Sequence, residues 1–188
     1  MKKSLIATLI AGLAFGTVAM AEESYIKLEG VHYNYTNAAN DQAGINLQIG
    51  TAIGNGFKAD VKQEFRHEDN TGKTSNRFEG GLTYEAKVYD KIGVSLRGAL
   101  GEKYASNSNY GYYLVEPGIS YALTDALKLK ASYRYRDAIN DSVADRTNTY
   151  KVGADYDINK TTFVTGSVGR TTGDKEYTSI QGGVGIRF

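Results

Sequence analysis

The last twelve residues of the chain, Tyr177 to Phe188, read YTSIQGGVGIRF. Every second position in this stretch is apolar or small: Thr178, Ile180, Gly182, Val184, Ile186 and Phe188. The intervening positions include Ser179, Gln181 and Arg187. Because successive side chains of a β-strand point to opposite faces, this period of two predicts a strand with one apolar and one polar face.

The same stretch resembles the C-terminal assembly signal of Gram-negative outer-membrane β-barrels. In that pattern a polar residue, a glycine, an apolar residue and a terminal aromatic residue follow at a fixed spacing, here Gln181, Gly183, Ile186 and Phe188. The resemblance implies that the barrel-assembly machinery inserts the chain into the outer membrane, where lipid and lipopolysaccharide surround it.

The first 21 residues have the order of a cleavable signal peptide. Lys2 and Lys3 precede an apolar segment from Leu5 to Val18, and a small-residue cleavage site ends at Ala21. The apolar segment is shorter than the roughly 20 residues that a membrane-spanning helix needs. We therefore expect residues 1–21 to be removed on export and residues 22–188 to form one outer-membrane barrel.

Composition narrows the fold and the partners. The chain has no cysteine, one proline, 22 glycines and 15 tyrosines, and its mean hydropathy is −0.40. A membrane barrel reaches such a value because its apolar residues alternate with polar ones. Without Lys2 and Lys3, 20 basic residues face 21 acidic ones, spread in alternation, so nucleic acid is not an expected partner.

Period-two patterns recur along the whole chain. We expect ten strands, at residues 24–36, 42–53, 57–68, 77–86, 92–100, 110–123, 127–136, 149–156, 162–171 and 177–188. Short turns near residues 55, 89, 125 and 160 alternate with longer polar loops near 39, 71, 106, 141 and 174. The pattern predicts a ten-stranded antiparallel transmembrane β-barrel with short periplasmic turns and modest extracellular loops. Counts of eight or twelve strands and a periplasmic β-sandwich are the alternatives.

Three strands have irregular patterns. In the first strand the apolar parity changes, which predicts a β-bulge near Glu29 and Gly30. Pro117 cannot donate a hydrogen bond within its strand, so we expect a bulge there as well. The pattern leaves the facing of strand 162–171 open.

Aromatic residues gather at the strand ends in two predicted interfacial girdles. The girdle near the turns comprises Phe57, Tyr84, Tyr121, Tyr156 and Phe188. The girdle near the loops comprises Tyr35, Phe65, Tyr104, Tyr135 and Tyr150.

The polar face of each strand must line the barrel interior. By parity, twelve basic residues point inward: Lys27, Lys58, Lys62, Arg66, Arg77, Arg97, Lys128, Lys130, Arg134, Arg136, Lys151 and Arg187. Eight acidic residues share this face: Glu29, Asp60, Glu64, Glu68, Glu79, Glu85, Glu116 and Asp155. A basic-leaning lumen predicts a narrow channel for small anionic solutes. The alternative is a non-conducting structural or adhesion-type barrel whose charges pair across the interior.

Other activities find little support in the sequence. His32 and His67 have no neighbours that would form a catalytic triad, so we do not expect an enzyme. The acidic loop 137–145 matches no calcium-binding spacing, and we expect neither a metal nor a cofactor.

Two internal segments, EFRHED at 64–69 and ASYRYRDAINDS at 131–142 after YALTDALKLK, resemble the oligogalacturonate-specific porin family. Members of that family are small monomeric barrels with lumens lined by arginine and lysine for acidic oligosaccharides. The resemblance implies that Arg66, Arg134 and Arg136 lie on the solute path. The resemblance and the inward facing of the basic residues together predict a solute path lined by Lys62, Arg66, Arg77, Arg97, Lys130, Arg134, Arg136 and Lys151. This chain is shorter than the members of that family, which indicates ten strands here in place of their twelve.

Overall fold

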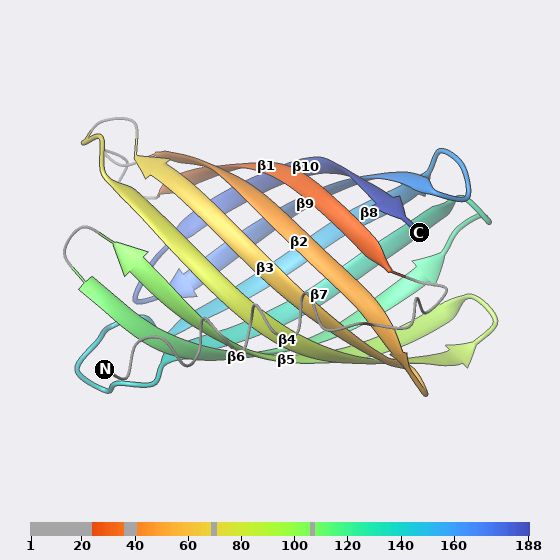
Figure 1. Ribbon diagram of the computed structural model, residues 1–188, viewed down its shortest axis with the longest axis horizontal. Coiled ribbons are helices and arrows are strands. Elements are labelled where there is room, and N and C mark those ends of the chain that lie inside the picture. Colours follow the sequence, from red (N-terminus) through yellow and green to blue (C-terminus); the bar gives the residue numbers. More distant parts are fainter. Residues whose placement is uncertain (1–23, 36–40, 69–70, 106–107) are drawn as a thin grey trace.

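The computed structural model describes residues 24–35, 41–68, 71–105 and 108–188. They form ten strands: β1 (Tyr25–Tyr35), β2 (Gln42–Gly54), β3 (Phe57–Glu68), β4 (Thr74–Tyr89), β5 (Ile92–Ala105), β6 (Ser108–Ala122), β7 (Leu127–Ala138), β8 (Thr147–Asp157), β9 (Thr162–Gly173) and β10 (Tyr177–Arg187). Each strand pairs antiparallel with its neighbour in the chain, and β1 pairs with β10, so the sheet closes on itself (Figure 1). The predicted ten-stranded barrel is confirmed. The expected signal peptide lies outside the described residues and stays a prediction.

The alternation of side chains divides the sheet into an apolar exterior and a polar interior. In β2, Ile45, Leu47 and Ile49 are 55, 37 and 41% exposed, whereas Asn46 between them is fully buried. Large apolar side chains are exposed in the same way on all ten strands. Such a surface is stable when lipid covers it, because each residue then meets a medium of its own polarity. Among the described residues, no helix is long and apolar enough to cross a membrane.

The two ends of the barrel differ in their connections. We call the end with the short links the turn end, formed by residues 55–56, 90–91, 123–126 and 158–161. The other end, the loop end, carries the longer link 139–146 (Figure 1). The expected strand ends on either side of the loop near residue 106, at residues 100 and 110, are wrong, because β5 and β6 continue their pairing as far as Ala105 and Ser108.

The barrel closes at the seam between β1 and β10, where the predicted assembly signal lies. A Cβ atom on Gly183 would overlap the carbonyl oxygen of Leu28 and lie 2.7 Å from the Cα atom of Glu29. Gln181 and Gly183 belong to the inward face, whereas Ile186 and Phe188 are exposed on the outward face. The close approach of the two backbones explains the glycine, and the assembly role of the four residues stays a prediction.

The predicted bulge at Glu29 and Gly30 is wrong. The β1 strand pairs with both β2 and β10 without a change of register. The apolar parity changes because Val31, Tyr33 and Tyr35 point into the barrel, where they meet Tyr177. Tyr35 is therefore not a member of the outer girdle. The turn-end girdle residues, by contrast, are all exposed as expected.

The predicted bulge at Pro117 is also wrong. Pairing between β6 and β7 passes from Val115–Tyr135 to Gly118–Ser132 with no shift of register. The ladder therefore accommodates Pro117 by omitting pairs and without an extra residue. In β9 the open question is settled, since Phe163 faces inward while Val164 and Val168 face outward.

Candidate functional site

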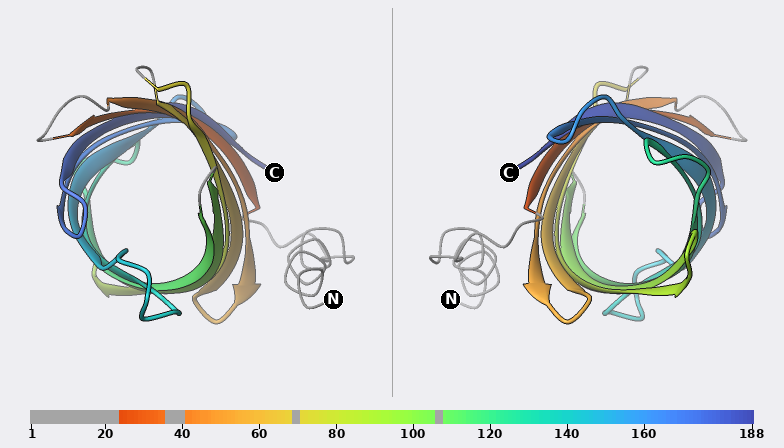
Figure 2. Two further views of the ribbon diagram at one scale, coloured as in Figure 1. Left: turned by 90° about the vertical axis from the view of Figure 1, so that its left-hand side faces the viewer. Right: turned by 90° about the vertical axis from the view of Figure 1, so that its right-hand side faces the viewer.

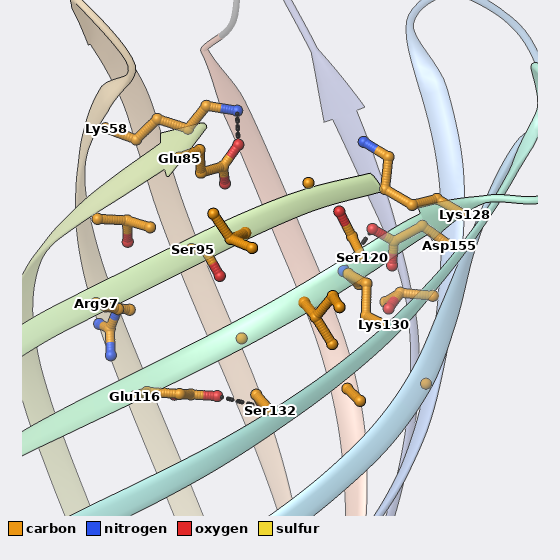
Figure 3. A pocket seen from close by; sticks show the side chains of 18 of the residues that line it. Lys58, Glu85, Ser95, Arg97, Glu116, Ser120, Lys128, Lys130, Ser132 and Asp155 are labelled. Atoms are coloured by element: carbon orange, nitrogen blue, oxygen red, sulfur yellow. Dashed lines mark hydrogen bonds and ion pairs between the residues drawn. The ribbon is translucent and has the colours of Figure 1, made fainter. Parts of the chain in front are cut away.

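The turn-end half of the barrel interior contains a cavity of about 930 Å³ (Figure 3). Its lining extends from Arg97 and Glu116 to the turn residues Gly56, Asp90 and Lys91. We call this cavity the vestibule. The end views in Figure 2 show the ring of strands that surrounds it.

Basic side chains outnumber acidic ones in the vestibule. The lining includes eleven basic residues: Lys27, Lys58, Lys62, Lys87, Lys91, Arg97, Lys128, Lys130, Arg134, Lys151 and Arg187. It includes six acidic residues: Glu29, Glu85, Asp90, Glu116, Asp155 and Asp157. The excess of five positive charges favours small anions over cations in this space.

One wall of the vestibule is organised around Glu116 of β6. The carboxylate of Glu116 accepts a hydrogen bond of 2.9 Å from the Ser132 hydroxyl (Figure 3). It accepts another of 2.7 Å from Nε of Arg134. The ammonium group of Lys151 lies 3.2 Å from the same carboxylate. Two positive charges therefore share one negative charge, and this wall remains cationic.

Lys62 of β3 provides a further cation in the vestibule. Among the described residues it makes no ion pair, whereas nearby Lys27 pairs with Glu29 at 3.2 Å. Lys130 is likewise neutralised by Asp155 at 2.5 Å. Lys62 repels Lys27 and Lys151 and attracts the carboxylates of Glu29 and Glu79. A bound anion near Lys62 would lower the repulsion among the three lysines.

Arg97 lies where the vestibule meets the loop-end half of the barrel interior. Its guanidinium group covers Gly81, so a Cβ atom at that position would lie 2.5 Å from Nη2. Arg97 bridges two carboxylates, with Nη2 2.7 Å from Asp60 and Nη1 2.6 Å from Glu79. The Tyr112 hydroxyl also donates to Glu79, at 3.1 Å. Because its charge is offset by two carboxylates, Arg97 is a structural link as much as an anion ligand.

The loop-end half of the interior is filled. Every strand contributes at least one buried inward residue here: Tyr33, Asn46, Glu64, Arg77, Ala99, Tyr112, Arg136, Thr147, Thr171 and Ser179. We call these residues, together with Val31, Arg66, Leu114, Asp145 and Tyr177, the plug. In the part of the chain that the structure describes, the plug occupies the path from the vestibule to the loop end.

The plug combines aromatic rings with buried charges. The guanidinium carbon of Arg66 lies 3.7 Å from the centroid of the Tyr33 ring, and the Tyr33 and Tyr177 rings meet edge to face at 5.3 Å. Glu64 accepts hydrogen bonds from Arg66 and Arg77. One carboxylate thus compensates two buried arginines, which requires close geometry.

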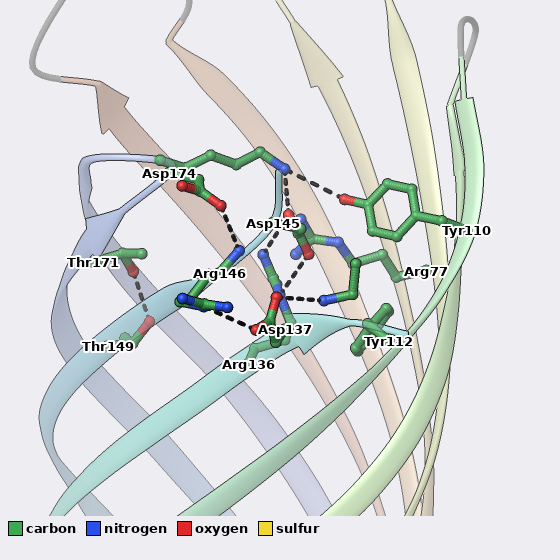
Figure 4. A network of polar contacts seen from close by, with 12 residues as sticks. Arg77, Tyr110, Tyr112, Arg136, Asp137, Asp145, Arg146, Thr149, Thr171 and Asp174 are labelled. Atoms are coloured by element: carbon green, nitrogen blue, oxygen red, sulfur yellow. Dashed lines mark hydrogen bonds and ion pairs between the residues drawn. The ribbon is translucent and has the colours of Figure 1, made fainter. Parts of the chain in front are cut away.

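A second cluster of charges ties the loop 139–146 to the plug (Figure 4). Asp145 is 1% exposed, forms an ion pair of 2.9 Å with Nε of Arg136 and accepts a hydrogen bond from Lys175. Burial raises the pKa of Asp145, but the positive charges of Arg136 and Lys175 outweigh this effect and hold the pKa at about 2. Asp145 is therefore ionised at neutral pH and anchors the loop.

The structure divides the predicted path between the two halves of the barrel. Five of its residues line the vestibule: Lys62, Arg97, Lys130, Arg134 and Lys151. The other three, Arg66, Arg77 and Arg136, face inward as expected but are buried in the plug. Sequence reasoning missed Asp145 and Lys175, since loop residues have no periodicity that reveals their facing. It would have found Tyr33 by continuing the parity of β1 without a bulge.

No protein-family model matches the chain, and no curated protein shows detectable similarity to it. Solved structures do share its fold. The NanC porin aligns with a TM-score of 0.59 at 8% identity, over 87% of this chain and 100% of NanC. An outer-membrane channel from Pseudomonas putida F1 aligns with a TM-score of 0.56 at 9% identity, over 93% of this chain and 98% of the channel. A KdgM porin in complex with disordered oligogalacturonate aligns with a TM-score of 0.50 at 13% identity, over 88% of this chain and 99% of the porin. At these identities the comparison shows the fold alone, that of small outer-membrane β-barrels.

Proposed function

We propose that the protein is an outer-membrane channel for small anionic solutes, with acidic oligosaccharides as the candidate class. The observation that carries the proposal is the vestibule of about 930 Å³, whose lining has eleven basic and six acidic residues. Arginine and lysine replace part of the hydration of a carboxylate or phosphate, and so favour anions in a narrow lumen. Because the plug fills the loop-end half, this arrangement is a closed state and conduction requires the plug to move.

The same proposal includes the location and the orientation of the protein in the membrane. The apolar outer surface and the fold shared with outer-membrane barrels support a location in that membrane, in contact with lipid. The vestibule then opens on the periplasmic side, because short turns face the periplasm in such barrels. Export by a signal peptide, insertion by the barrel-assembly machinery and a monomeric state belong to the proposal as predictions.

A second candidate function is a non-conducting barrel with a salt-bridged interior. The observation that favours it is the burial of Glu64, Arg66 and Arg77 in the plug. If these charges serve only to hold the barrel together, its function resides in the surface that it presents outside the cell.

The experiment that separates the two candidates is single-channel recording of residues 22–188 in a planar bilayer under a salt gradient. A channel gives discrete current steps with a reversal potential on the anion side. Lys62→Glu combined with Lys130→Glu should move this potential toward cation preference, because both side chains line the vestibule. Lys160→Glu is the matched control, since Lys160 is exposed in a turn outside the vestibule.

Folding of each variant is checked by its heat-modifiable migration in gels. A folded barrel that gives no current steps, either as wild type or with the plug loosened by Asp145→Ala, would contradict the channel proposal. The non-conducting candidate would then remain.

A further inference from the structure

The lipid-facing surface carries one basic side chain that the vestibule and the plug do not use. Among the arginine and lysine residues of the described strands, only Arg170 of β9 points outward. A cationic side chain on this face is costly at the centre of a bilayer and tolerated near its interfaces. Arg170 lies three positions before the end of β9 (Thr162–Gly173), so it belongs to the loop-end interface.

Arg170 has only weak partners within the protein. Its guanidinium group is 3.5 Å from the Glu176 carboxylate and 3.4 Å from the Thr178 hydroxyl, and its side chain is 45% exposed. Both distances are long for hydrogen bonds between such groups. The guanidinium group is therefore available to an external anion, and Thr178 offers a hydroxyl donor beside it.

Toward the middle of the bilayer, Arg170 borders a groove of about 650 Å³ on the outer surface, which crosses β6 to β10. The part of the groove nearer the turn end is apolar and is formed by Ile119, Ala131, Val152 and Val168. The Tyr133 and Tyr150 rings, whose centroids are 5.2 Å apart, lie in the same cross-strand row as Arg170, because Tyr133 pairs with Tyr150 and Tyr150 pairs with Arg170. The groove is thus amphipathic along the membrane normal, with its polar end at the loop-end interface.

We propose that this groove binds lipopolysaccharide from the outer leaflet. A phosphate of the lipid A moiety contacts Arg170 and Thr178 in place of Glu176, and an acyl chain covers Val152, Val168 and Ala131. An arginine fork suits a phosphate because it forms two parallel charge-assisted hydrogen bonds. The loop end faces the outer leaflet in barrels of this type, which places the phosphate and the guanidinium group at the same depth. The site is independent of conduction through the interior.

The test uses native mass spectrometry of residues 22–188, refolded in detergent and titrated with diphosphoryl lipid A. We expect one saturable adduct per barrel and little binding of dephosphorylated lipid A. Arg170→Gln should weaken the affinity about tenfold, the effect of losing one charge-assisted contact. Lys160→Gln, which removes a charge at the turn end, should leave the affinity unchanged.

A second variant tests the apolar part of the groove. Ala131→Phe fills the groove but leaves Arg170 in place, so it should also weaken binding of diphosphoryl lipid A. Heat-modifiable migration confirms that each variant is folded. Equal binding by wild type and Arg170→Gln, or equal binding of phosphorylated and dephosphorylated lipid A, would overturn the proposal. Phosphatidylglycerol binding as tightly as lipid A would overturn it too, because the surface would then attract any anionic lipid.

Discussion

The vestibule and the plug have the same construction and opposite properties. Both have a wall of alternating residues in which arginine or lysine pairs with glutamate or aspartate. In the vestibule, the side chains of the Arg187–Asp157 pair are 35 and 37% exposed, whereas those of Arg136 and Asp145 in the plug are 6 and 1% exposed. A charged stripe therefore does not define a water-filled channel by itself.

The size of the neighbouring inward residues makes the difference. The vestibule is bordered by small residues such as Gly93, Ser95, Gly118, Ser120 and Gly153. The plug contains the rings of Tyr33, Tyr112 and Tyr177, all of which are buried. An eight-stranded barrel is just filled by its side chains, and ten strands enclose a somewhat wider space. At this width, small residues leave a cavity and tyrosines close it.

The largest expected effect comes from breaking the plug at Glu64. Glu64→Ala leaves Arg66 and Arg77 buried without their shared carboxylate, which should destabilise the barrel by about 3–5 kcal/mol. Urea unfolding of the protein in lipid vesicles measures this change. A loss below about 1 kcal/mol would show that water already reaches these arginines.

The next effect concerns the opening of the plug. Asp145→Ala removes the partner of Arg136 and Lys175, so the loop 139–146 should detach and the path to the loop end should open. We expect the open fraction in planar bilayers to rise about tenfold or more, the factor that corresponds to about 1.4 kcal/mol. An unchanged record of current steps, with the barrel folded, would mean that the loop does not hold the plug closed.

Acid should have a similar but graded effect on the loop. Because the pKa of Asp145 in the folded protein, about 2, lies below its ordinary value of about 3.9, ionised Asp145 stabilises the folded state above about pH 4. This stabilisation, about 2–3 kcal/mol, is lost as the pH falls through 2. Pepsin cleavage within residues 139–146 should increase between pH 4 and pH 1.5. The Asp145→Ala variant, which has no group to titrate, is the control and should be cleaved readily at both values.

The smallest effect is expected in the vestibule. Asp157→Ala removes an ion pair whose two side chains are more than one third exposed, so water and salt already screen it. The free energy of unfolding should change by less than about 1 kcal/mol in the same urea assay. A loss as large as that for Glu64→Ala would remove the contrast between the two halves of the barrel.

The sequence by itself determined the closed barrel and the facing of most of its side chains. Period-two alternation in β3, from Phe57 to Glu68, allows one apolar and one charged face and no other arrangement in a sheet. The irregular strands were harder, because Val31 and Tyr33 are apolar residues that face inward, and parity reasoning assigned such residues to the lipid side.

Only the tertiary structure decided which inward charges are accessible. Arg134 and Arg136 are two positions apart on one strand and both point into the barrel, yet one lines the vestibule and the other is buried beside Asp145. The alternation fixes the direction of a side chain but not what lies opposite it. The opposite wall comes from distant strands and from loops such as 139–146, whose positions depend on how the whole barrel closes.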